Sequence, residues 1–182
     1  MNIASFRFDE NDAKAVASMR SLEELSFDND VFDDLEKEHL VSVSDNGVWF
    51  LANGLAQLKD LSFTECKNIT IEGVKAIVNG ASTSHLTELR LDCRLGVDEC
   101  MAIANGTSMT RLERIWGTVI TADGFSAIAG GISMKSLKVI RANIRGLGFS
   151  VSRALLIAEE MPSLVSLIID RTTHDIIRPM VN

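Results

Sequence analysis

Histidine and cysteine are the residue types that most often hold a catalytic or structural metal, and their spacing here does not favour one. The three histidines and three cysteines form neither a His-x-x-x-His nor a Cys-x-x-Cys pair; they are His39, His85, His174, Cys66, Cys93 and Cys100. Cys66 and Cys93 could approach each other on neighbouring turns of a repeating fold. Reduced cysteines are, however, more often small core residues than zinc ligands. We therefore expect no metal site and no cofactor.

Motifs for nucleophilic catalysis and for phosphate binding are also missing. Gly124-Phe-Ser126 begins like a nucleophile elbow, but Ile128 stands where that motif needs its second glycine. Gly146-Leu-Gly148 supplies two glycines of a dinucleotide fingerprint without the third, and such a pair is typical of a turn. We expect no catalytic residues, so the sequence does not predict an enzyme.

Composition and charge narrow the class of partner. The 182-residue chain has a formal net charge of −7, which disfavours nucleic acid and anionic membranes, because both need clustered lysine and arginine. No basic leader opens the sequence, and no segment approaches the ~18 consecutive apolar residues of a membrane helix. An odd number of cysteines in such a chain indicates reduced thiols. We expect one domain over residues 1–182 in a cytoplasmic, or another reducing intracellular, compartment.

An apolar triplet with spacings of three and then two residues recurs along the whole chain. Its last two members alternate with polar residues, as in a strand that is buried on one face. The triplets are Ile3/Phe6/Phe8, Leu22/Leu25/Phe27, Leu58/Leu61/Phe63, Leu86/Leu89/Leu91, Leu112/Ile115/Gly117, Leu137/Ile140/Ala142 and Leu164/Leu167/Ile169. Each triplet predicts one strand.

A second marker recurs in step with the first: a pair of turn-forming residues that follows a short helical stretch. The pairs are Asn53-Gly54, Asn79-Gly80, Asn105-Gly106 and Gly130-Gly131, at spacings of 26, 26 and 25, after helical stretches at 48–52, 73–78, 100–104 and 124–129. Glycine adopts the left-handed conformation that often ends a helix, so we expect these pairs to act as C-caps. The predicted unit is strand, turn, helix and cap.

These residues resemble the leucine-rich repeat, whose pattern is Leu-x-x-Leu-x-Leu-x-x-Asn/Cys-x-Leu. The match is best over Leu58-Lys-Asp-Leu61-Ser-Phe63-Thr-Glu-Cys66-Lys-Asn-Ile69, and the helical sequence after it is similar to the ribonuclease-inhibitor-like and cysteine-containing subtypes. The resemblance covers nearly the whole chain. Other repeats depart from the Asn/Cys position, where Arg94, Ile120 and Arg145 stand, and we expect irregular turns there.

The resemblance implies an α/β fold: a right-handed, horseshoe-shaped leucine-rich-repeat solenoid of about six to seven repeats. Its parallel sheet would line the concave face and its helices the convex face. Leu22 and Leu58 are 36 residues apart, which predicts an insertion of about ten residues within 29–46. The last repeat, 164–182, would be incomplete, which leaves the solenoid ends open for another subunit to cap.

The exposed strand positions form the candidate binding face. It is acidic through Glu24, Asp28 and Asp60 and then turns basic and aromatic; the residues that we expect to bind a partner are Glu88, Arg90, Asp92, Arg114, Trp116 and Arg141. Tryptophan and arginine are enriched among interface hot spots. Trp116 has two interpretations: a binding residue on this face, or a ring turned inward to fill the space beside Gly117.

The insertion offers a second candidate surface. Phe32 and Leu35 could form a small apolar strip between the carboxylates of Asp33, Asp34 and Glu36, suited to a basic partner. The alternative is a merely solvated acidic loop.

Together these patterns favour a non-catalytic protein-interaction scaffold, or a subunit of a larger assembly, that binds through the concave strands and the solenoid ends. The resemblance leaves two alternatives. One is a substrate adaptor of a ubiquitin ligase, although no F-box-like module precedes the repeats. The other is a GTPase regulator that uses a turn arginine such as Arg94 or Arg145.

Overall fold

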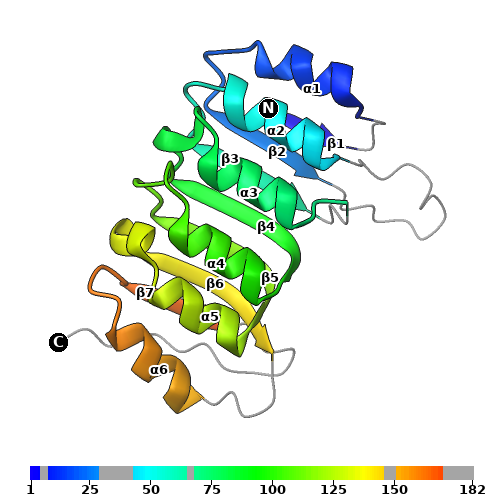
Figure 1. Cartoon of the computed structure of the whole chain (residues 1–182). Coiled ribbons are helices and arrows are strands. Elements are labelled where there is room, and N and C mark those ends of the chain that lie inside the picture. Colours follow the sequence, from blue (N-terminus) through cyan, green and yellow to red (C-terminus); the bar gives the residue numbers. More distant parts are fainter. Residues whose placement is uncertain (5–7, 29–42, 65–67, 146–150, 170–182) are drawn as a thin grey trace.

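The computed structural model describes residues 1–4, 8–28, 43–64, 68–145 and 151–169, and within them the chain is an α/β protein with one parallel sheet. The sheet has seven strands whose spatial order equals their order in the chain, as Figure 1 shows. The strands are β1 (Asn2–Ala4), β2 (Glu24–Asp28), β3 (Asp60–Thr64), β4 (Glu88–Leu95), β5 (Arg114–Thr121), β6 (Val139–Arg145) and β7 (Ser166–Ile169). The strand predicted for each triplet from Leu22 onward is confirmed.

One α-helix lies between each pair of consecutive strands, and in Figure 1 the helices form a layer on one side of the sheet. They are α1 (Glu10–Ala17), α2 (Asp45–Gly54), α3 (Ile71–Asn79), α4 (Val97–Asn105), α5 (Ala122–Ala129) and α6 (Val151–Glu159), with short 3-10 turns η2 (Thr83–His85) and η3 (Ile132–Ser136) before β4 and β6. The four predicted helices are confirmed as α2 to α5. α2, α3 and α4 extend past both predicted ends, and α5 begins earlier than predicted. The earlier starts of α2, α3 and α5 follow from the side chains of Ser44, Thr70 and Thr121, which cap the first turns of these helices.

The core lies between the two layers and consists of rows of side chains in register. Leu25, Leu61, Leu89, Ile115, Ile140 and Leu167 are paired from strand to strand, and all are almost completely buried. They belong to one continuous cluster of buried residues that runs from Phe8 to Ile169. No strand–helix unit can bury its apolar side alone, so each depends on its neighbours.

The strand predicted for the first triplet is present as β1, but its predicted register is wrong. It equated Phe8 with Phe27, whereas the sheet pairs Ile3 with Phe27. Phe8 lies beyond β1 and packs edge-on against Phe27, with ring centroids 4.9 Å apart. The start of α1 leaves Phe8 no room in a strand: Asp9 caps the helix and forms a capping box with Asp12, so the helix begins at Glu10.

The glycines at the ends of α3, α4 and α5 are the C-cap residues, as predicted, but the left-handed conformation expected of them is wrong. Gly80, Gly106 and Gly130 have φ angles of −63°, −60° and −78°, which any residue adopts. Close packing explains two of them. A Cβ on Gly80 would lie 2.5 Å from the carbonyl oxygen of Ala52, and one on Gly106 would lie 2.6 Å from Cβ of Val78. Glycine is required because the preceding unit approaches so closely.

The asparagines of the same pairs join neighbouring units. The amide of Asn53 donates to the Trp49 carbonyl inside α2, and its oxygen accepts the N–H of Ala81 from the next unit. Asn79 repeats this arrangement one unit later, with the Lys75 carbonyl and the N–H of Thr107. These side chains therefore satisfy backbone groups at the helix ends and fix the distance between units.

The residues for which irregular turns were expected belong to extended strands. β4, β5 and β6 continue through Arg94, Ile120 and Arg145, and the register shifts between Leu91 and Arg94 and again between Gly117 and Val119. A strand that carries one residue more than its neighbour accommodates it as a bulge. Most of the predicted insertion (29–46), and the part of the last repeat after Ile169, lie outside the described residues.

A glycine pair tests the packing explanation. We expect Gly80→Ala to lower the free energy of unfolding by about 1–3 kcal/mol, because its Cβ would overlap the backbone of Ala52. Gly130→Ala is the matched control: its nearest neighbour would be 3.6 Å away, so we expect it to stabilise the fold by about 0.4–1 kcal/mol. Urea unfolding measures both, and equal effects would contradict the close approach.

Candidate binding face

The side of the sheet opposite the helices carries two rows of side chains. Because side chains alternate along a strand, the residues between the core positions point away from the helix layer. The first row is Glu24, Asp60, Glu88, Arg114, Val139 and Ser166, and the second row is Ser26, Ser62, Arg90, Trp116, Arg141 and Ile168. Five of the six residues predicted to bind a partner are members of these rows.

The first row begins with three carboxylates on adjacent strands. Glu24, Asp60 and Glu88 are in register, and neighbouring strands lie about 4.8 Å apart. Burial raises the pKa of Asp60 above its ordinary value, and the charges of Glu88 and Glu24 raise it further. Arg114 and the Met1 ammonium act in the opposite direction without cancelling the effect. Ionisation of Asp60 is therefore less favourable in the folded chain than in an ordinary exposed carboxyl.

The charge of the first row changes from negative to positive at β5. Arg114 donates from Nε to Glu88 at 2.5 Å, in a pair that solvent partly reaches. This hydrogen bond raises the pKa of Arg114 above its already high value. Glu88 is therefore neutralised from the β5 side, whereas Glu24 and Asp60 form no salt bridge with other described residues.

The second row places Trp116 between two arginines. The register pairs Trp116 with Arg90 on one side and Arg141 on the other, and the Arg141 guanidinium lies 5.4 Å from the centroid of the indole. Such a cation–π contact is worth about 0.5–1 kcal/mol at exposed sites. The space beside Gly117 is bordered by Ile120 and Leu95, each about 3.5 Å from where its Cβ would be. Trp116 thus stands in the row of the arginines.

The indole nitrogen of Trp116 is unusual. Trp116 is half-buried, but its Nε1 is fully buried and has no hydrogen-bond partner in the structure as described. An unpaired buried donor costs about 1–3 kcal/mol. The indole ring of Trp116 is therefore partly covered by its neighbours, and its nitrogen is held away from solvent.

The side chains of several residues predicted to bind a partner lie outside the described part of the structure. Asp92 is paired in register with Thr64 on β3, but its side chain lies outside the described part. The same holds for the whole acidic insertion, so Phe32, Asp33, Asp34, Leu35 and Glu36 remain predictions.

Sequence reasoning missed a hollow on this face. A depression of about 300 Å³ lies over β2, β3 and β4, and its lining includes Glu24, Ser26, Asp60, Ser62, Glu88 and Arg90. The serines gave no functional signal in the sequence, because small polar residues are ordinary at exposed strand positions. Their period-2 placement beside the carboxylates was the one clue.

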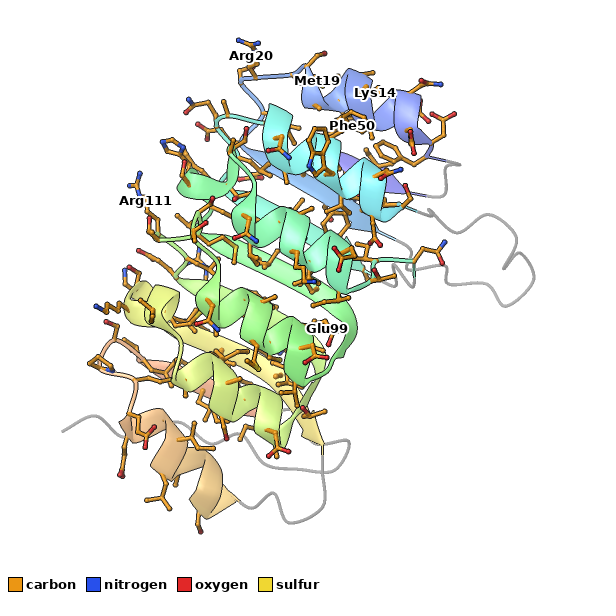
Figure 2. The ribbon with its side chains drawn as sticks, viewed as in Figure 1. Lys14, Met19, Arg20, Phe50, Glu99 and Arg111 are labelled. Carbon is orange, nitrogen blue, oxygen red and sulfur yellow. The ribbon has the colours of Figure 1, made fainter. Side chains whose placement is uncertain are left out.

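The helix layer has its own surface features on α1, α2 and α3. Trp49 is 53 % exposed and, with Glu72, Lys75 and Asn79, lines a second depression of about 280 Å³ between α2 and α3. Figure 2 shows Phe50 of α2 beneath Lys14 of α1, whose ammonium lies 4.7 Å from the ring centroid. These contacts hold exposed aromatic rings in place and bring no reactive groups together.

The described residues contain no group of three histidine, cysteine or acidic side chains that could hold a metal ion. Cys100 is buried beneath the helix layer, with its sulfur 4.0 Å from the Leu95 carbonyl oxygen. Nor does any helix in the described ranges have the length and apolarity to cross a membrane. No protein-family model matches this sequence, and no curated protein matches it either.

The raised pKa of Asp60 predicts a pH-dependent stability. The folded chain holds the Asp60 proton more tightly than the unfolded chain, whose carboxyl titrates near 3.8, so the unfolding free energy falls as pH rises through the folded pKa. We expect Asp60→Asn to be more stable than wild type at pH 7, with a difference that vanishes below pH 3.8. Urea unfolding at both pH values measures this difference.

Glu160→Gln serves as the control, because this exposed carboxylate lies after α6 and outside both rows. A stability at pH 7 that is lower in Asp60→Asn than in the wild type would contradict the repulsion within the first row.

Proposed function

We propose that this chain is a leucine-rich-repeat solenoid that binds a protein partner, without catalysis, through the sheet face opposite its helices. The observation that carries the proposal is the second row, in which Trp116 is aligned between Arg90 and Arg141 on the face opposite the described helices.

Four structural features support the repeat assignment. Consecutive strands are neighbours in one parallel sheet, a helix follows each strand from β1 to β6, and the helices lie on one side. The apolar pairs Leu61/Phe63 and Leu89/Leu91 occupy equivalent buried positions in successive strands. Fixed spacing, a repeated unit and contacts between nearest neighbours are what define a solenoid.

The composition of the face favours binding over catalysis. Its functional groups stand in straight rows across several strands and do not converge on one reacting atom, whereas catalysis needs groups held around one centre. Aromatic and arginine side chains dominate the energetic centres of protein interfaces, and the second row supplies Trp116 with an arginine on either side.

The charge gradient indicates how a partner would be oriented. The first row carries carboxylates on β2 to β4 and Arg114 on β5, while the cations of the second row stand on β4 and β6. A partner with basic groups over β2 and β3 and acidic groups over β5 and β6 would be complementary. Complementarity of this kind acts mainly on association rate and orientation, and salt screens it.

A paired tryptophan experiment tests the proposal. The tagged chain is used to capture partners from its native source, and proteins captured by wild type are compared with those captured by Trp116→Ala and Arg141→Ala. We expect each substitution to reduce capture of a specific partner by about tenfold or more, because hot-spot side chains contribute most of the binding energy.

Trp49→Ala is the matched control, because it removes an exposed indole from the helix layer. Partner capture that survives both row substitutions, or that Trp49→Ala reduces equally, would refute binding through the sheet face.

A further inference from the structure

Four asparagines of this chain are followed directly by glycine: Asn46, Asn53, Asn79 and Asn105. Asparagine is among the thermolabile residues of proteins, because the next backbone nitrogen can attack its side-chain amide carbon. Glycine at the next position favours this reaction, since it has no Cβ to obstruct the approach. The tertiary structure decides which of the four pairs reacts.

Two of the pairs are held within α2. Asn46 lies in the first turn, where the N–H of the next glycine donates to the Ser44 hydroxyl at 3.2 Å and the Asn46 amide donates to Glu10 at 2.9 Å. Asn53 and its glycine are also helical, and the Asn53 oxygen accepts the N–H of Ala81 at 3.1 Å. Attack closes a five-membered ring that requires a ψ angle outside the helical range. These hydrogen bonds must therefore break before either pair can react.

The other two pairs span the ends of their helices. Asn79 and Asn105 are the last residues of α3 and α4, and the glycine after each is extended, with ψ angles of 139° and 134°. The N–H groups of these glycines donate to Ile77 and Ile103 at similar distances, 3.3 and 3.4 Å. A helix end opens at less cost than its interior, so both pairs are closer to a reactive conformation.

Hydrogen bonds with the following unit distinguish these two asparagines. The side-chain oxygen of Asn79 accepts the N–H and the hydroxyl of Thr107, at 3.4 and 3.3 Å. Ile132 occupies the equivalent position after α4, and in the described structure it forms no hydrogen bond with Asn105. The Asn105 amide donates to the Met101 carbonyl at 3.0 Å, as the Asn79 amide does within its own helix. Only the oxygen of Asn105 is left without a tether to the next unit.

We propose that Asn105 is the site at which this chain spontaneously deamidates. The backbone nitrogen of Gly106 forms a bond to Cγ of Asn105, the bond from Cγ to Nδ2 breaks, and Nδ2 leaves as ammonia with the proton that Gly106 loses. Water then opens the imide at either carbonyl, which leaves an aspartyl or an isoaspartyl residue at position 105. No electrons are transferred, and water is the sole co-reactant.

The product weakens the contact between the α3 and α4 units. A carboxylate cannot donate to the Met101 carbonyl, and it places a negative charge at the C-terminal end of α4, where the helix dipole disfavours it. The isoaspartyl form also lengthens the main chain beside Gly106, where a Cβ would lie 2.6 Å from Cβ of Val78. We therefore expect the product to unfold at a lower urea concentration than the unmodified chain. The inference is independent of partner binding, because Asn105 lies in the helix layer and outside both rows.

Peptide mapping of the aged chain tests the proposal. The folded chain is incubated in mildly alkaline buffer at physiological temperature and then digested with trypsin, and mass spectrometry measures the conversion of each amide to a carboxyl. Fragment ions separate the two asparagines that share a peptide. The tryptic peptides are 38–59 for Asn46 and Asn53, 76–90 for Asn79, and 95–111 for Asn105.

We expect Asn105 to deamidate about threefold or more faster than each of the other three asparagines, because each of those must first lose at least one further hydrogen bond. In concentrated urea, where these bonds are absent, we expect all four to react at similar rates. Thr107→Ala removes one donor to Asn79 and should raise the rate at Asn79 by about twofold, with no change at Asn53.

Three results would overturn the inference: no deamidation in the folded chain, a rate at Asn105 no greater than that at Asn79, or the same ranking of the four sites in urea. The last result would assign the preference to the local sequence and not to the fold. An unchanged rate at Asn79 in Thr107→Ala would reject protection by the hydrogen bonds between units.

Discussion

The register of apolar side chains between successive strand–helix units is the constraint on which the rest of the structure depends. Leu61 packs beside Leu25 on one strand and Leu89 on the next, and the same relation holds at every step from β2 to β7. Side chains alternate along a strand, so a slip of one residue would turn every buried leucine toward water. Burial of the core rows therefore determines which residues face away from the helices.

Contacts at the edges of the units hold this register constant. At the start of each strand from β3 to β7, one carbonyl of the preceding unit accepts two consecutive N–H groups, as Lys59 does from Thr87 and Glu88. At the other edge, glycines such as Gly80 allow the backbones of neighbouring units to touch. With the separation fixed at both edges, the exposed residues become straight rows. A broad surface of aligned exposed side chains follows from packing alone.

The same alignment has an electrostatic cost. Placing leucines in register also places Glu24, Asp60 and Glu88 in register, and like charges on adjacent strands repel each other. Arg114 offsets this for Glu88, whereas Asp60 stays partly buried between two acidic neighbours. The register that buries the leucines therefore makes ionisation of Asp60 less favourable in the folded chain.

The sequence by itself determined the strands from Leu22 to Leu167, the helices before the Asn-Gly pairs and the division of strand residues between two faces. These features follow from local periodicity, which needs no knowledge of distant residues. The register of Ile3 against Phe27, the close approach at Gly80 and the hollow around Ser62 were decided only in the tertiary structure. Each of these depends on contacts between residues at least 24 positions apart, and a local pattern does not encode the distance to which neighbouring units approach.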